Sequence, residues 1–171
     1  MKSITQPRHC PPFKVIIAGV FLLSCAWSAW RVAGSIVVVQ GDSMLPSFHP
    51  NDYAFAVPPP RGLQRGDVVI LDDGHQDYAI KRIVGLPGET VYFSRGQVFI
   101  NRRPLHEPYL DRNTLTYPNQ KLALFILGKE QYFVMGDNRG NSIDSRTYGP
   151  VGIERIRKTV PTSAPRAVFT P

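Results

Sequence analysis

The chain has 171 residues, which leaves room for an N-terminal anchor and one compact domain but not for two independent cores. An apolar fraction of 43%, with 16 prolines and 14 glycines, favours many turns over long helices and predicts a mainly β domain. The net charge of +7 is spread along the chain without helix-turn-helix or zinc-finger spacing, which argues against a nucleic-acid partner. We attribute the basic charge to attraction toward lipid headgroups or to a solvated surface.

Cysteine and histidine positions bear on disulfides and metals. The two cysteines, Cys10 and Cys25, lie in a proline-rich leader and in an apolar run, so neither can staple a globular domain. The four histidines, at positions 9, 49, 75 and 106, lack the paired spacing of zinc ligands. We therefore expect no metal and no cofactor.

An uncharged run, VIIAGVFLLSCAWSAW, lies between Lys14 and Arg31. At about 1.5 Å per residue the run is shorter than the hydrocarbon layer of about 30 Å, so it predicts a short transmembrane helix over 15–31, completed by snorkelling of the flanking cations. The basic residues of the leader, 1–14, place the N-terminus in the cytoplasm. A cleaved export signal is the alternative interpretation, but the apolar character continues to Trp30, which favours a retained anchor.

Short apolar runs separated by turn residues fill most of the remaining chain and are typical of strands. Residues 58–62 must form a connection, 94–97 a hairpin turn and 101–121 a long surface excursion. We expect an antiparallel β-sheet domain over 35–160 and a flexible tail over 161–171. The predicted strands cover residues 36–40, 52–57, 67–71, 78–84, 89–93, 97–100, 132–135 and 154–160.

The segment GDSMLP, residues 41–46, follows the first predicted strand and can present Ser43 at a strand end. A serine between glycine and proline is commonly only a turn residue. Its hydroxyl becomes a good nucleophile only when a neighbouring base, either a histidine with a carboxylate or a neutral lysine, takes its proton.

Lys81 is a candidate for that base. Strand alternation places it on the same face as the apolar Ala79 and Ile83, with Arg82 on the other face. Apolar surroundings disfavour the ammonium form and lower the pKa of a lysine toward the range where it can accept a proton. A snorkelling lysine at a strand edge is the alternative.

Four segments decide between these interpretations, because they resemble, in order, the conserved boxes of signal peptidase I. They are GDSMLP at 41–46, RGDVV at 65–69, KRIVGLPGE at 81–89 and GDNRGNSIDSR at 136–146. The resemblance implies a mainly antiparallel β domain on a membrane anchor. It also implies preprotein substrates whose signal peptides carry small residues at the first and third positions before the cut.

The resemblance also implies residue roles. Ser43 is expected to be the nucleophile and Lys81 the general base, with Ser142 orienting the lysine. Asp144 and Arg146 correspond to a structural ion pair beside the site. One branch of the family carries a hydroxyl two residues before the nucleophile, where this chain has Gly41, so the backbone amide of Ser43 is the expected oxyanion donor.

An extended peptide is expected to add beside a strand edge near 37–40 or 79–81, where small apolar pockets select Ala-like side chains. The expected pocket residues are Met44, Val37, Val39, Ala79 and Ile80. Neutral Lys81 then takes the proton of Ser43, and an acyl-enzyme forms and is hydrolysed.

Three alternatives stay open at this point. One is a dedicated peptidase of a conjugation or pilus system in the same family. Another is a repressor-type Ser-Lys autoprotease, although the chain carries no DNA-binding domain and has an apolar segment that such a protein does not need. The third is a silent membrane-tethered module that binds peptides. The expected location is the bacterial plasma (inner) membrane, crossed once, with the catalytic domain on the extracytoplasmic side.

Overall fold

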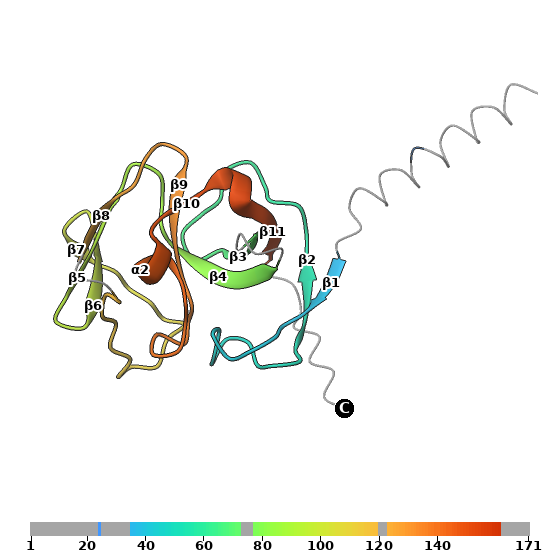
Figure 1. The fold of residues 1–171 in the computed structure, drawn as a ribbon, viewed down its shortest axis with the longest axis horizontal. Coiled ribbons are helices and arrows are strands. Elements are labelled where there is room, and N and C mark those ends of the chain that lie inside the picture. The colour runs from blue at the N-terminus through green and yellow to red at the C-terminus, as the bar shows by residue number, and fades with distance from the viewer. Residues whose placement is uncertain (1–23, 25–34, 73–76, 120–122, 162–171) are drawn as a thin grey trace, which may run out of the picture. The chain divides into compact units, whose positions relative to one another are not determined.

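The computed structural model describes residue 24 and residues 35–72, 77–119 and 123–161 (Figure 1). The predicted leader, almost all of the predicted anchor at 15–31 and the tail beyond residue 161 lie outside this part of the chain. Among the described residues, no helix has the length and apolar character needed to cross a membrane. The chain divides into two compact units, 1–33 and 34–171, and the second unit is the one described below.

The described residues of the second unit form three antiparallel sheets, which confirms the mainly antiparallel β class. A two-stranded sheet pairs β1 (Ser35–Val38) with β2 (Tyr53–Ala56). A five-stranded sheet has the order β10 (Val151–Gly152), β9 (Gln131–Met135), β4 (Tyr78–Gly85), β3 (Val68–Asp72) and β11 (Ile156–Val160). A four-stranded sheet has the order β7 (Arg103–Pro104), β6 (Gln97–Ile100), β5 (Thr90–Ser94) and β8 (Leu124–Ile126).

All eight predicted strands are present, although residues 154 and 155 belong to a 3-10 helix, η1 (Ile153–Arg155). The strands that the sequence did not predict, β7, β8 and β10, have two or three residues, too few for alternation to be recognised. The expectation that 101–121 is a surface excursion is wrong for Thr116. Its side chain is buried and its N–H donates to the Gly96 carbonyl at 2.8 Å.

The four-stranded sheet packs against β4 and β9 through an aromatic cluster. Phe133 of β9 is fully buried, and its ring centroid lies 4.8 Å from that of Phe125 and 6.0 Å from that of Phe93. Val84 and Met135 complete the contact from the five-stranded sheet. In Figure 1, β9 and β10 accordingly run between the four-stranded sheet on one side and β3, β4 and β11 on the other.

A second contact fixes the β1–β2 ribbon. Met44, which follows β1, is fully buried and packs with Ala54 and Ala56 of β2 against Val68 and Ile70 of β3. The ribbon is therefore fastened by its apolar inner face to the sheet that contains β4.

The pairing of β4 leaves part of one edge open. β4 pairs with β3 over Tyr78–Arg82 but with β9 only from Arg82 to Gly85. Among the described strands, β1 likewise has one neighbour, β2. Among the described strands, the start of β4 and the outer side of β1 thus each present an unpaired edge.

Replacing Phe133 with alanine should lower the free energy of unfolding by about 3–5 kcal/mol, because it empties the centre of the cluster between the sheets. Urea unfolding, followed by far-UV circular dichroism, measures this change in the free energy of unfolding. Ile126→Ala is the control, since 74% of that residue is exposed, and it should change stability by at most about 0.5 kcal/mol. Equal losses in the two variants would contradict this packing.

Candidate active site

The turn after β1 presents Ser43. Gly41 has φ of +73°, a conformation that strains residues with a side chain, and it lets the chain reverse directly after the strand. Leu45 N–H donates to the Asp42 carbonyl at 3.2 Å and closes the turn. Because Met44 is anchored in the core, Ser43 is held half-buried at the tip.

Lys81 meets Ser43 from β4. Its Nζ lies 3.0 Å from Ser43 Oγ and also donates to the Ile80 carbonyl at 2.9 Å. Only 5% of Lys81 is exposed. Its cross-strand neighbour Val69 packs in one cluster with Ala79 and Ile83, so the face expected from alternation is apolar. The snorkelling alternative is therefore wrong.

Burial is the main influence on the Lys81 amine and lowers its pKa, while the carboxylates of Asp144 and Asp137 act in the opposite direction. The net direction is downward, so a neutral amine next to the serine hydroxyl is more accessible here than at an exposed lysine. Such an amine can accept the hydroxyl proton, which an ammonium group cannot do.

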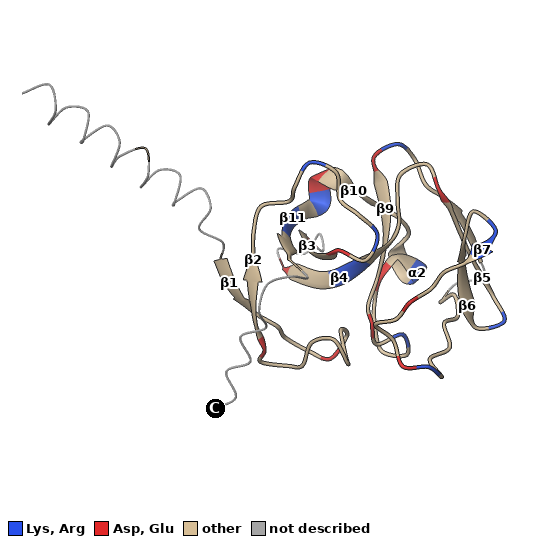
Figure 2. Cartoon of the chain, turned by 180° about the vertical axis from the view of Figure 1, so that it is seen from behind, with Lys and Arg blue, Asp and Glu red and all other residues tan. Residues whose placement is uncertain are grey.

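Each of the two carboxylates is bound to its own arginine. Arg146 Nε and Nη2 donate to Asp144 at 2.9 and 2.8 Å, and Arg82 Nε and Nη2 donate to Asp137 at 2.8 and 2.5 Å. Burial raises the pKa of Asp144, but the bonds from Arg146 and from the Gly136 N–H outweigh it and lower the pKa. Figure 2 shows the basic residues on β4 and the charged residues at the start of α2 (Ser145–Tyr148).

A further ion pair was not predicted from the sequence. Arg139 is buried and pairs with Glu107, which also accepts from the Tyr109 hydroxyl at 2.6 Å. The Tyr109 ring covers the Arg82 guanidinium, 4.1 Å from its centroid. The segment 101–121 thus holds the charged loop after β9 in place. The pairing of Glu107 with Arg139 could not be predicted from the sequence, because the residues around Glu107 show no periodicity.

Ser142 lies beside the same turn. A Cβ built on Gly136 would stand 2.3 Å from Ser142 Oγ and 2.4 Å from the Ser43 carbonyl oxygen, so only glycine fits between them. Ser142 Oγ is buried and has no hydrogen-bond partner among the described residues. The structure therefore brings Ser142 to the Ser43 backbone but shows no bond from its hydroxyl to Lys81.

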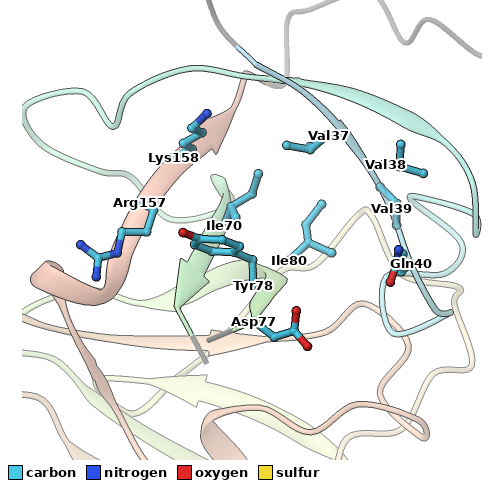
Figure 3. A pocket seen from close by; sticks show the side chains of 10 residues that line it. All are labelled: Val37, Val38, Val39, Gln40, Ile70, Asp77, Tyr78, Ile80, Arg157 and Lys158. Carbon is cyan, nitrogen blue, oxygen red and sulfur yellow. The ribbon is translucent and has the colours of Figure 1, made fainter. Parts of the chain in front are cut away.

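An apolar groove of about 540 Å³ lies between β1 and the start of β4 (Figure 3). Neither Ser43 nor Lys81 lines it, but Ile80, the neighbour of Lys81 in β4, does. Of the expected pocket residues, Val37, Val39 and Ile80 line it. Met44 does not, since it is fully buried beneath the ribbon, and Ala79 packs against another cluster. The further lining residues are Val38, Gln40, Ile70, Asp77, Tyr78, Arg157 and Lys158, the last two from β11.

Histidine and acidic side chains bear on the alternative base and on metal binding. His49 Nδ1 lies 3.8 Å from Asp52 Oδ2, with the imidazole 66% exposed, and no bond joins it to Ser43 in the described part of the chain. There is also no group of three or more His, Cys, Asp or Glu side chains there that could hold a metal ion.

Comparison with known proteins gives one family. The family model described as signal peptidase, peptidase S26, matches residues 13–162. Signal peptidase I of Bacillus amyloliquefaciens is 38% identical over 118 residues, covering 64% of this chain and 63% of that protein. Signal peptidase I T of Bacillus subtilis (strain 168) is 37% identical over 132 residues, covering 70% and 67%.

A solved structure is also similar. The crystal structure of a signal peptidase I from Enterococcus faecalis V583 has a TM-score of 0.48 and 28% identity, covering 59% of this chain and 98% of that chain. The alignments with the first two curated relatives span 63% and 64% of those proteins, a little under two thirds.

The lowered pKa of Lys81 makes a prediction about stability. Between that pKa and the ordinary lysine value, the unfolded chain binds more protons than the folded chain, so the free energy of unfolding rises with pH. Lys81→Met removes this rise, and the stability difference between wild type and variant should grow in favour of the wild type from neutral to alkaline pH. Urea unfolding at a series of pH values measures it.

Lys129→Met, which removes an exposed lysine, controls for the loss of one positive charge. A difference between wild type and Lys81→Met that stays constant with pH, or matches the control, would contradict the burial argument.

Proposed function

Since the chain belongs to the signal peptidase S26 family, we propose that it is a membrane-bound serine endopeptidase that removes signal peptides from exported preproteins. Ser43 is the nucleophile and Lys81 the general base. The observation that carries the proposal is the 3.0 Å contact between Lys81 Nζ and Ser43 Oγ at a buried amine whose pKa is lowered. A silent peptide-binding module would have no use for such a pair.

The substrate segment binds as an extended strand in the groove. The open edges of β1 and of the start of β4 offer backbone donors and acceptors on either side, which hold a peptide without reading its sequence. The groove floor of Val37, Val39 and Ile80 accepts small apolar side chains. This arrangement suits signal peptides with small residues before the cut.

Acylation follows from the pair. Neutral Lys81 takes the proton of Ser43 Oγ as the oxygen attacks the carbonyl carbon, and the resulting ammonium returns that proton to the leaving amine. The Ser43 N–H donates to no acceptor among the described residues, so it is available for the oxyanion. Lys81 then takes a proton from water, which hydrolyses the acyl-enzyme and restores the serine.

Ser142 is the group that orients Lys81. Its buried hydroxyl is unpaired within the described residues, and a buried unpaired hydroxyl costs about 1–3 kcal/mol. Rotation of this hydroxyl toward the amine during the reaction satisfies it and restricts the direction of the lysine. Met44 supports the pair from below, and the ion pair of Asp144 and Arg146 holds the adjoining loop.

The enzyme belongs in the bacterial plasma (inner) membrane, with lipid as its surroundings. The apolar run at 15–31 serves as the single-pass anchor and 1–14 as the cytoplasmic leader, and the peptidase domain over 35–160 works on the extracytoplasmic side, with 161–171 as a tail. The family match supports this assignment because it begins at residue 13 and includes the apolar run.

The first test is cleavage of a preprotein carrying an Ala-x-Ala site by the detergent-solubilised full chain. The wild type should cut after the second alanine, while Ser43→Ala and Lys81→Ala should lose at least about 10³-fold in rate, since each removes a member of the nucleophile–base pair. Circular dichroism checks that the variants fold. Equal cleavage by all three proteins would refute the mechanism.

The rate should also depend on pH through Lys81. Because the amine must be neutral, kcat/KM should be low in acid and rise with pH through the lowered pKa of Lys81. His49→Ala and His106→Ala should leave the profile in place. A profile that rises through a histidine pKa and disappears in either histidine variant would show that the base is not Lys81.

A further inference from the structure

The loop after β9 grips the turn that carries the nucleophile. The Asn138 N–H donates to the Ser43 carbonyl at 3.0 Å, and its side-chain Nδ2 donates to the Asp42 carbonyl at 3.0 Å. Asn141 Nδ2 donates to the Asp42 carboxylate at 3.1 Å. Two successive carbonyls of the turn are therefore held by one residue.

These bonds set the direction of the Ser43 amide. The Asp42–Ser43 peptide bond is trans, so its planar group points the Asp42 C=O and the Ser43 N–H in opposite directions. The Asp42 oxygen is held on one side by Asn138 Nδ2 and by the Leu45 N–H at 3.2 Å. The Ser43 N–H must then point to the other side, where it meets no acceptor among the described residues.

We propose that Asn138 is a positioning residue, which aims the Ser43 N–H at the oxyanion by holding the Asp42 carbonyl. This inference rests on the proposed peptidase function. A donor that is already oriented stabilises the developing charge without reorganisation in the transition state, whereas a donor free to rotate with its peptide plane does not.

The chemistry of the two asparagines separates their roles. The Asn138 amide supplies an N–H to a backbone oxygen of the peptide plane. The Asn141 side chain donates to the Asp42 carboxylate, which does not fix that plane, while the Asn141 backbone N–H donates to the Asn138 carbonyl at 3.0 Å and is kept in an alanine variant. Asn138→Asp keeps the shape but places a carboxylate against the Asp42 carbonyl, and Asn141→Ala is a control from the same loop.

The experiment measures steady-state cleavage of an Ala-x-Ala peptide by the full chain in detergent, for wild type, Ser43→Ala, Asn138→Ala, Asn138→Asp and Asn141→Ala. Both Asn138 variants should lose about 10- to 100-fold in kcat, with KM within about twofold of the wild type. Asn141→Ala should keep kcat within about threefold. The pH profile should stay in place, because the hydrogen bonds of Lys81 go to Ser43 and to the Ile80 carbonyl and not to Asn138.

Wild-type kcat in both Asn138 variants, an equal loss in Asn141→Ala, or a shifted pH profile would overturn the inference. A second readout does not need cleavage: the Ser43 amide signal in a ¹H–¹⁵N spectrum should shift in Asn138→Asp and stay in place in Asn141→Ala. An unchanged Ser43 amide in Asn138→Asp refutes the inference in any case. If the folded wild type leaves the peptide uncut, the proposed function fails, and the inference is then decided by this amide signal alone.

Discussion

The burial of one amine beside one hydroxyl is the constraint on which the rest of the site depends. Lys81 lies 3.0 Å from Ser43, and its pKa is lowered by loss of water rather than by a neighbouring cation. Two buried carboxylates, Asp144 and Asp137, act in the opposite direction and raise the pKa of Lys81. Each has a bidentate arginine partner, which leaves burial as the larger influence.

The fold serves this constraint through β4. The strand is central in its sheet, so its middle is buried, and its pairing with β9 begins only at Arg82, which leaves the preceding edge unpaired, as the proposed peptide binding requires. The β1–β2 ribbon supplies the opposite edge and ends in the turn of Ser43. Buried Met44 fastens this turn, and the excursion with Glu107 fastens the loop that faces it.

Much of this could be predicted from sequence, where the signal is local. Short apolar runs between turn residues predicted the strands, and alternation placed Lys81 beside Ala79 and Ile83. Contacts between distant segments gave no such signal. The pairing of Glu107 with Arg139 and the position of Ala79 outside the groove depend on how the sheets meet, which no local pattern records.

The central claim is that burial against Ser43 lowers the pKa of Lys81 below that of an exposed lysine, which makes the neutral amine more accessible. The most direct test follows the ¹³Cε signals of labelled lysines with pH, with Lys81 assigned from the spectrum of Lys81→Met. The account predicts that the Lys81 signal titrates at clearly lower pH than that of exposed Lys129. A Lys81 signal that titrates together with Lys129 would contradict it.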